Sequence, residues 1–183
     1  LDLLYEAAGM SPQKRLERLE SSQETVLQRD DAVQQQIVLY VLSGQYDKAI
    51  DMLSHRHFHV WEGGGAIHDV YVSAHLLRGQ QHFKNKRYRA ARQDYEAARE
   101  YPENLEVGRP YRAPRDSEIY YLIATAFEAL GDAAQARAFY EKSVAEQPDI
   151  AEMRYFQGLA FRRLDQEARA ASILAGLVET GKK

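Results

Sequence analysis

All six histidines of the chain lie between His55 and His82. Imidazole nitrogens and carboxylate oxygens are ligands that zinc and other first-row divalent ions accept readily. His57 and His59 are two residues apart, so an extended segment would point both side chains the same way. One hypothesis is therefore a metal-dependent hydrolase that uses these two residues together with nearby donors, Glu62 and His68.

The spacing of the histidines argues against that hypothesis. The chain has no HExxH pattern, and His75 and His82 fall at helical spacing, where a neutral histidine with one satisfied nitrogen suits a core. The sequence has no cysteine, which excludes disulfides, thiolate catalysis and cysteine-ligated zinc. It also lacks a GxSxG nucleophile motif. We therefore predict no bound metal, no cofactor and no intrinsic enzyme activity.

A second candidate site surrounds the only tryptophan, Trp61, which precedes Glu62 and the glycines Gly63, Gly64 and Gly65. An aromatic face beside a carboxylate and accessible backbone amides suits recognition of a sugar or a peptide. The alternative is that the tryptophan packs on the preceding helix and the glycines let the chain turn. The run lacks the GxGxxG pattern and the lysine of a P-loop, so it does not predict a nucleotide site.

A third candidate is a cationic segment in which prolines alternate with Arg109, Tyr111 and Arg112. Guanidinium groups offer forked donors to carboxylates and phosphates. Acidic residues are close in sequence, so internal ion pairing or a solvated face is the simpler interpretation: Asp94, Glu96, Glu100, Glu103 and Glu106. A net charge of -3 further argues against nucleic acid as the partner.

Repeats of about 34 residues would position these candidates. The best copy covers residues 117–150 and resembles a tetratricopeptide helix-turn-helix in the spacing of its packing residues, Tyr120, Ile123, Ala124, Phe127, Ala136, Tyr140 and Pro148. Further copies occupy residues 30–63, 72–105 and 151–183, the last with Asp165 where a turn glycine is usual. Such a unit cannot bury its apolar face alone, so the pattern predicts a stacked array with a concave surface.

We predict an all-α, tetratricopeptide-like right-handed solenoid of about four to five helix-turn-helix repeats in a single domain. Its expected parts are a degenerate helical pair at 1–29, repeats at 30–56, 72–102 and 117–150, a capping repeat at 151–183, and inserted loops at 57–69 and 103–116. The chain starts within an amphipathic pattern and has no apolar run of about 18 residues. We expect a soluble fragment of a larger protein with no membrane partner, the bacterial cytoplasm being slightly favoured.

The seventh residue of the repeat departs from the pattern expected of tetratricopeptide repeats. It is usually apolar, yet three of the four copies carry a polar residue there, namely Gln36, Arg78 and Gln157. We expect either a slight rotation of these helices or looser packing around them.

Three runs go beyond the general pattern: FHVWEGGGAIHDVYVSAHLLRG, YPENLEVGRPYR and RDSEIYY. They are similar to the C-terminal repeat region of bacterial proteins whose N-terminal half is a domain of unknown function resembling a galactose-mutarotase-like β-sandwich. The similarity extends over most of the chain, and it implies a repeat region packed beside a carbohydrate-active domain. The loop residues at such a contact, or at the rim of a shared carbohydrate site, would be His57, His59, Trp61, Glu62, Gly63, Gly64, His68, Arg109, Tyr111 and Arg112.

The repeat frame also predicts which side chains line the concave groove. They are Gln34, Val38, Val41, Leu76, Gln80, Phe83, Tyr121, Thr125, Glu128, Tyr155, Leu159 and Arg162. Superfamily members that bind chaperone tails use lysine, arginine and asparagine at such positions to clamp a terminal carboxylate, and this set is absent here. A mixed aromatic and polar groove instead fits an extended peptide or a neighbouring domain. We therefore expect a non-catalytic scaffold that docks on its own N-terminal domain, with a free peptide-binding adaptor or the metal-dependent hydrolase as alternatives.

Overall fold

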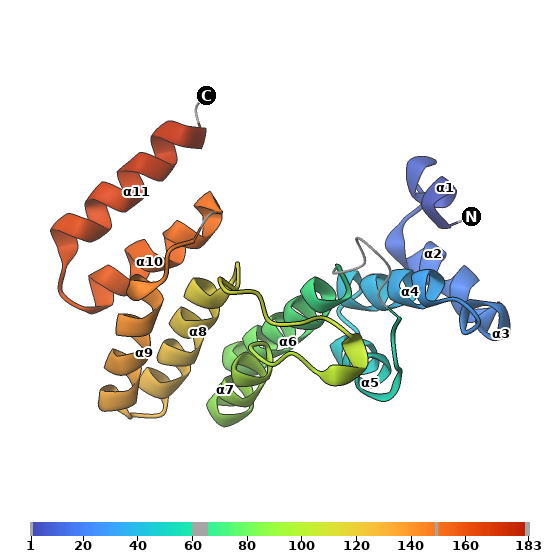
Figure 1. Cartoon of the computed structure of the whole chain (residues 1–183), viewed down its shortest axis with the longest axis horizontal. Coiled ribbons are helices and arrows are strands. Elements are labelled where there is room, and N and C mark those ends of the chain that lie inside the picture. The colour runs from blue at the N-terminus through green and yellow to red at the C-terminus, as the bar shows by residue number, and fades with distance from the viewer. Residues whose placement is uncertain (1, 60–65, 149, 182–183) are drawn as a thin grey trace. The chain divides into compact units, whose positions relative to one another are not determined.

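The computed structural model describes residues 2–59, 66–148 and 150–181, and within these ranges the chain is helical, with no strand (Figure 1). The all-α class predicted from the sequence is confirmed. The chain divides into two compact units. The first contains residues 1–78 and 101–108, and the second contains residues 79–100 and 109–183.

The first unit is built around the antiparallel pair α4 and α5. Its elements are α1 (Asp2–Ala7), α2 (Pro12–Glu20), α3 (Gln23–Val26), α4 (Asp30–Leu42), α5 (Tyr46–His55), the larger part of α6 (Ala66–Lys84) and the 3-10 helix η1 (Glu103–Leu105). Helix α4 packs on both α2 and α5, and buries Val33 and Ile37 completely. Helix α6 begins at Ala66, inside the range 57–69 that the sequence analysis treats as an inserted loop.

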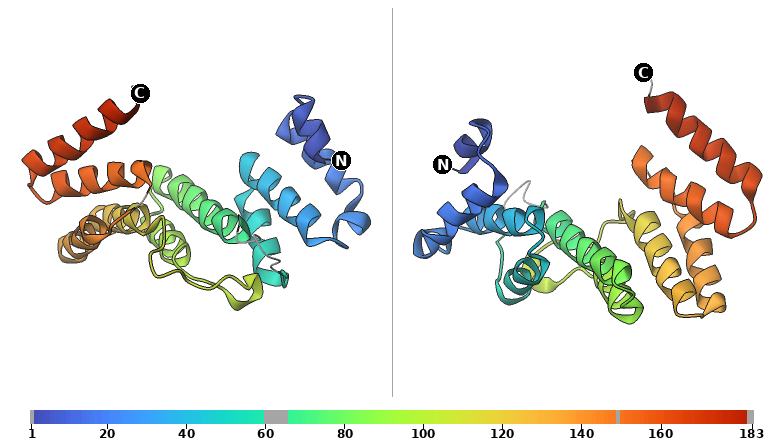
Figure 2. Two further views of the ribbon diagram at one scale, coloured as in Figure 1. Left: turned by 45° about the horizontal axis from the view of Figure 1, so that its top comes forward. Right: turned by 180° about the vertical axis from the view of Figure 1, so that it is seen from behind.

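The second unit consists of successive antiparallel helix pairs. It contains the end of α6 together with α7 (Tyr88–Ala97), α8 (Asp116–Ala129), α9 (Ala133–Ala145), α10 (Ala151–Arg163) and α11 (Glu167–Gly181). Helix α8 lies along α9, and α10 lies along α11, in all views (Figures 1 and 2). Helix α10 also packs on α8 and α9, so each pair covers the apolar face that its neighbour exposes.

The same hydrogen bond closes the turn of every helix pair. The amide three residues after the end of the helix donates back to a carbonyl in its last turn: Gln45 to Tyr40, Arg87 to His82, Asp132 to Phe127 and Gln166 to Phe161, at 2.8 to 3.0 Å. The residue directly before the donor has a positive φ, and it is Gly44, Lys86, Gly131 and Asp165 in turn. Glycine suits this left-handed backbone. The other two turns adopt it with lysine and aspartate, which explains how the last pair forms without a glycine.

Small residues allow the paired helices to approach closely. The second helix of each pair buries an alanine at the equivalent place, namely Ala49, Ala91, Ala136 and Ala170. On the opposite helix, Gly79 faces Tyr95, and Gly158 faces Leu174. A side chain at either glycine would fall on these neighbours, so the close crossing depends on its absence.

The polar residues at the usually apolar position bind to the preceding helix pair. Gln36 is fully buried and exchanges two hydrogen bonds with Gln23. Arg78 pairs with Asp47 at 2.8 Å. The Gln157 amide donates to the carbonyls of Ser143 and Glu146 at the end of α9. The contacts of Gln36 and Gln157 satisfy buried groups, and the half-buried Arg78 forms an ion pair, so a polar residue is accommodated at this position in all three copies.

Candidate functional site

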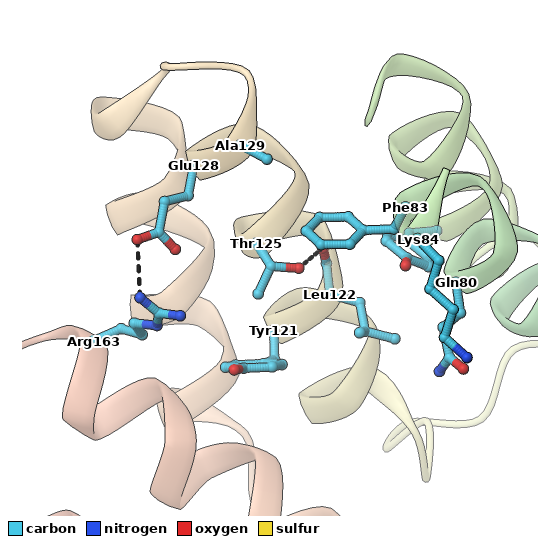
Figure 3. Close-up of a pocket in the computed structure, with 10 residues that line it drawn as sticks. Gln80, Phe83, Lys84, Tyr121, Leu122, Thr125, Glu128, Ala129 and Arg163 are labelled. Atoms are coloured by element: carbon cyan, nitrogen blue, oxygen red, sulfur yellow. Dashed lines mark hydrogen bonds and ion pairs between the residues drawn. The ribbon is translucent and has the colours of Figure 1, made fainter. Parts of the chain in front are cut away.

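A cavity of about 540 Å³ opens on the second unit. It is formed by the end of α6, by α7, by the face of α8 and by the last residue of α10 (Figure 3). The side chains around it are Gln80, Phe83, Lys84, Tyr95, Tyr121, Leu122, Thr125, Glu128, Ala129 and Arg163. Its size falls in the range of small-ligand and side-chain pockets, about 300–1,000 Å³.

Aromatic rings form the apolar wall of this cavity. Phe83 lies edge-on to Tyr88, with 5.1 Å between ring centroids, and projects over the cavity (Figure 3). Tyr121 packs between Tyr140 and Phe156, with centroid distances of 5.7 and 5.8 Å. Phe83 and Tyr121 are half-buried, so part of each ring is available to a ligand.

One side of the cavity is polar and internally paired. Glu128 accepts hydrogen bonds from the Tyr140 hydroxyl at 2.7 Å and from Arg163 Nη1 at 3.1 Å. The Thr125 hydroxyl donates to the Leu122 carbonyl at 2.7 Å, as drawn in Figure 3. Gln80 and Lys84 lie at the opposite edge and carry an amide and an amine.

Tyr121, which lines the cavity, and Tyr140, whose ring packs against it, stay protonated at physiological pH. Burial raises the pKa of Tyr121, although the neighbouring Arg163 lowers it in part. Burial and the hydrogen bond to Glu128 also raise the pKa of Tyr140. Because both phenols keep their protons, they can serve as hydrogen-bonding and packing groups.

The predicted groove residues do not all meet in this cavity. Five of them line it: Gln80, Phe83, Tyr121, Thr125 and Glu128. Four others do not line it. Tyr155 and Arg162 are exposed on α10, and Leu159 is half-buried there. Leu76 is only 1% exposed and faces the core. Gln34, Val38 and Val41 belong to α4 of the first unit, where the first two are half-buried and Val41 is buried. Leu76 and Val41 are thus core residues, which corrects their assignment to an open surface.

Five lining residues were not predicted as groove residues, namely Lys84, Tyr95, Leu122, Ala129 and Arg163. Four of them directly follow a predicted groove residue on the same helix, whereas Tyr95 lies on α7, where no groove residue was predicted. A helix face about 100° wide can include two residues that are adjacent in sequence. The repeat pattern assigned only one of the two to the groove. Including the next residue at each predicted position would have found these four residues but not Tyr95.

The predicted loop surface is divided between the two units. His57, His59 and His68 belong to the first unit, and Arg109, Tyr111 and Arg112 belong to the second. Trp61, Glu62, Gly63 and Gly64 lie outside the described residues.

The histidines of the first unit do not form the predicted group. His68 is buried on α6, and its ring stacks on Tyr101 with 3.8 Å between centroids. His57 and His59 are exposed and lie instead beside Glu106. Within the described residues, His68 is therefore not part of the cluster formed by the other two, because helix α6 already holds it in the core.

The arginine segment of the second unit is mostly paired internally. Arg109 binds the buried Asp116 at 2.5 Å and also donates to the Arg99 carbonyl at 3.2 Å. Arg112 borders a small cavity of about 40 Å³ beside Glu146. Tyr111, in contrast, is fully exposed, so it is the residue of this segment most accessible to a partner.

The chain can now be compared with known proteins. A family model described as tetratricopeptide repeat matches residues 76–149 and 121–182, which together cover more than half of the chain. The chain belongs to the tetratricopeptide repeat family. Repeats of this family present extended concave binding surfaces and typically bind proteins without catalysing reactions.

Solved structures support the tetratricopeptide fold over the whole chain. One, "Crystal structure of MamA", is 15% identical, with a TM-score of 0.51, and the match covers 100% of this chain and 95% of that chain. "MamA 41-end from Desulfovibrio magneticus RS-1" is 18% identical, with a TM-score of 0.51 and coverage of 99% and 91%. "MamA RS-1 ArsTM double mutant" is also 18% identical, with a TM-score of 0.52 and coverage of 99% and 90%. At these identities the similarity concerns the fold alone. No helix among the described residues is long and apolar enough to cross a membrane.

Asp30, the first residue of α4, holds the segment that follows α5. Its carboxylate accepts hydrogen bonds from Arg56 at 2.6 and 2.9 Å, and from the backbone amide of His59 at 3.0 Å. Burial by itself raises the pKa of Asp30, but these hydrogen bonds and the arginine charge outweigh burial and lower the pKa overall. The ionised carboxylate is therefore the form that stabilises the fold.

We expect this contribution to disappear in acid. Because the folded pKa is lowered, the stabilisation is complete above the ordinary value of 3.8 and is lost as the pH falls through the folded value. Asp30→Asn should lower Tm at pH 7, and its difference from wild type should shrink below about pH 4. Circular dichroism melts between pH 3 and 7 measure this, with the exposed Asp51→Asn as control. A difference that stays constant down to pH 3 would contradict the assignment.

Proposed function

We propose that this protein is a non-catalytic interaction scaffold whose second unit binds an extended peptide segment by one apolar side chain. The observation that carries the proposal is the cavity between Phe83 and Tyr121, which combines half-exposed rings with polar groups at its edge. Membership of the tetratricopeptide family supports it, because such repeats typically bind protein segments on their inner helices.

The lining indicates what the bound segment contains. An aliphatic or aromatic side chain buried against Phe83 and Tyr121 contributes about 1.5–3 kcal/mol. The Gln80 amide can both donate to and accept from a peptide backbone, as an extended segment requires. Lys84 adds a positive charge at the edge, whereas Glu128 is engaged by Arg163. We therefore expect an apolar anchor residue with an acidic residue beside it.

Peptide selection provides the test. A random 12-residue library displayed on phage is selected against the wild-type protein, and the affinity of each selected peptide is measured by fluorescence polarisation. We expect Phe83→Ala to weaken binding at least tenfold, about 1.4 kcal/mol, because the anchor loses its aromatic contact. Phe83 is a cleaner choice than Tyr121, which also packs on Tyr140 and Phe156.

The matched control is Tyr111→Ala. This side chain is fully exposed on the predicted loop surface and does not line the cavity. Its removal should leave the selected peptides bound with unchanged affinity. If Tyr111→Ala abolished binding and Phe83→Ala did not, the loop surface would be the binding site and the cavity proposal would be wrong.

We further propose that the occupant comes from the protein's own N-terminal domain. The support is the resemblance of the WEGG region to repeats that accompany a β-sandwich domain, which would be carbohydrate-active and would place loop residues at a shared sugar site. Small-angle scattering of a protein containing both parts tests this. Independent tumbling of the repeat region would exclude docking and would favour the second candidate, a free adaptor that binds peptides of other proteins.

A further inference from the structure

A second cluster of polar side chains belongs to the first unit and shares no residue with the lining of the peptide cavity. It begins in the extended segment after α5, where Phe58 is only 2% exposed. Successive side chains of an extended segment alternate in direction. His57 and His59, on either side of Phe58, therefore both face solvent, and their ring centroids are 5.0 Å apart.

The other side of the cluster is Glu106, which directly follows the 3-10 helix η1. The preceding Leu105 is fully buried, and Glu106 itself has a left-handed backbone with φ 52°. Because Leu105 is buried and the backbone of Glu106 has a defined conformation, the position from which the Glu106 side chain extends is fixed. Glu106 is therefore held by the backbone next to the two histidines, although it is 49 residues from His57 in sequence.

Main-chain contacts hold these two segments together. The Phe58 amide donates to the Asn104 carbonyl at 2.8 Å. The Asn104 side chain donates to the carbonyls of Leu53 and Arg56, both at 2.7 Å. Asp30 fixes the first segment from the opposite direction. The backbone that carries the three polar side chains is thus organised before any ligand binds.

The distances within the cluster suit a metal ion. His57 Nε2 lies 2.7 Å and His59 Nδ1 lies 3.6 Å from the same Glu106 oxygen. One donor atom from each of the three residues lies within 4.8 Å of the others. With bonds of about 2.0–2.2 Å, donors around a tetrahedral ion are about 3.3–3.6 Å apart. The His59 distance already matches, and the His57 distance needs to lengthen by less than about 1 Å.

We propose that His57, His59 and Glu106 bind one divalent transition-metal ion, zinc by the nature of the donors. Two imidazoles and one carboxylate are an accepted zinc ligand set, with water completing the coordination. The ion links the segment after α5 to the segment after η1 and so stabilises the first unit. The proposal departs from the sequence analysis, which predicts no bound metal, and it uses Glu106 where the alternative hydrolase hypothesis used His68. It does not depend on the peptide-binding proposal.

A metal ion at this site would connect the segment after α5 to the segment after η1. The side chains of His57, His59 and Glu106 are 54%, 68% and 40% exposed, so an ion reaches them directly from solvent. Exposed ligands with one or two bound waters predict a moderate affinity, and the protein should fold without the ion. Its addition should then raise the melting temperature of the folded chain.

Calorimetric titration of the wild-type protein with zinc chloride tests the site. The protein carries no histidine tag and is first stripped with a chelator. We expect one equivalent to bind, and a saturating zinc concentration of about 100 times Kd to raise Tm by about 5 °C or more. His57→Ala and Glu106→Gln should each weaken zinc binding at least tenfold, while their melting curves without zinc stay close to wild type because both side chains are exposed.

The matched control is His55→Ala. His55 is exposed at the end of α5 and pairs with Asp51, outside the cluster. It should bind zinc as the wild type does. Less than about 0.2 equivalents bound by the wild type would overturn the proposal, and the His57–Glu106 contact would then be a hydrogen bond only. Binding that survives His57→Ala and Glu106→Gln, or that is lost in His55→Ala, would overturn it equally.

Discussion

Leu105→Ala is expected to lower the free energy of unfolding of the first unit by about 2–5 kcal/mol. Leu105 belongs to the single turn of η1, yet it is fully buried within the described structure. Shortening the side chain leaves a cavity beneath a segment that has few other apolar contacts to close it. Urea denaturation followed by circular dichroism measures the loss directly.

Leu42→Ala is the matched control for this effect. The same substitution is made on a leucine that is 61% exposed at the end of α4. We expect a change within about 0.5 kcal/mol, as is usual for surface substitutions. Equal effects of the two substitutions would show that η1 is not part of the core of the first unit.

Gly79→Ala should also destabilise the protein, by about 1–3 kcal/mol. A Cβ atom at this position would lie 2.5 Å from Cε1 and 2.7 Å from Cδ1 of Tyr95. Tyr95 is only 1% exposed, so its ring cannot move aside into solvent. The clash therefore outweighs the gain of about 0.5–1 kcal/mol that alanine normally brings to a helix interior. Thermal and urea unfolding both report the change.

Gly176→Ala is the matched control, because it changes helix propensity in the same way but introduces no steric clash. Gly176 lies inside α11, and a Cβ atom there meets no other described atom within 4 Å. Alanine should stabilise this position by about 0.5–1 kcal/mol, the opposite sign to Gly79→Ala. If both substitutions were stabilising, the close approach of α6 and α7 would be wrong.

The fold was predictable because packed helix pairs require particular residue types at regular intervals in the sequence. The recurring small residues, such as Ala91 and Ala136, and the turn glycine Gly131 indicate where helices cross and reverse. The turns at Lys86 and Asp165 could not be recognised in this way, because tertiary packing imposes a left-handed backbone that these residues do not prefer. The role of Gln157 was also hidden, since its partners are backbone carbonyls and carry no sequence signal.

The candidate sites were predictable only in part. Phe83 and Tyr121 were found because they lie on the inner face of regular helices, where the repeat frame applies. The alternative hydrolase hypothesis grouped His68 with His57 because they are near in sequence, whereas in the structure Glu106 lies beside His57 and His59. Helix α6 begins early enough to bury His68, whereas Glu106 reaches the cluster through a fold contact that sequence spacing does not encode.

The central claim is that a peptide binds in the cavity of the second unit. A selected peptide carrying a nitroxide label, titrated into isotopically labelled protein, tests it most directly by paramagnetic broadening in amide NMR spectra. The account predicts strongest broadening at residues 80–84 and 121–128, which line the cavity, and loss of this pattern in Phe83→Ala. Broadening centred on residues 109–112, or on α4, would contradict it.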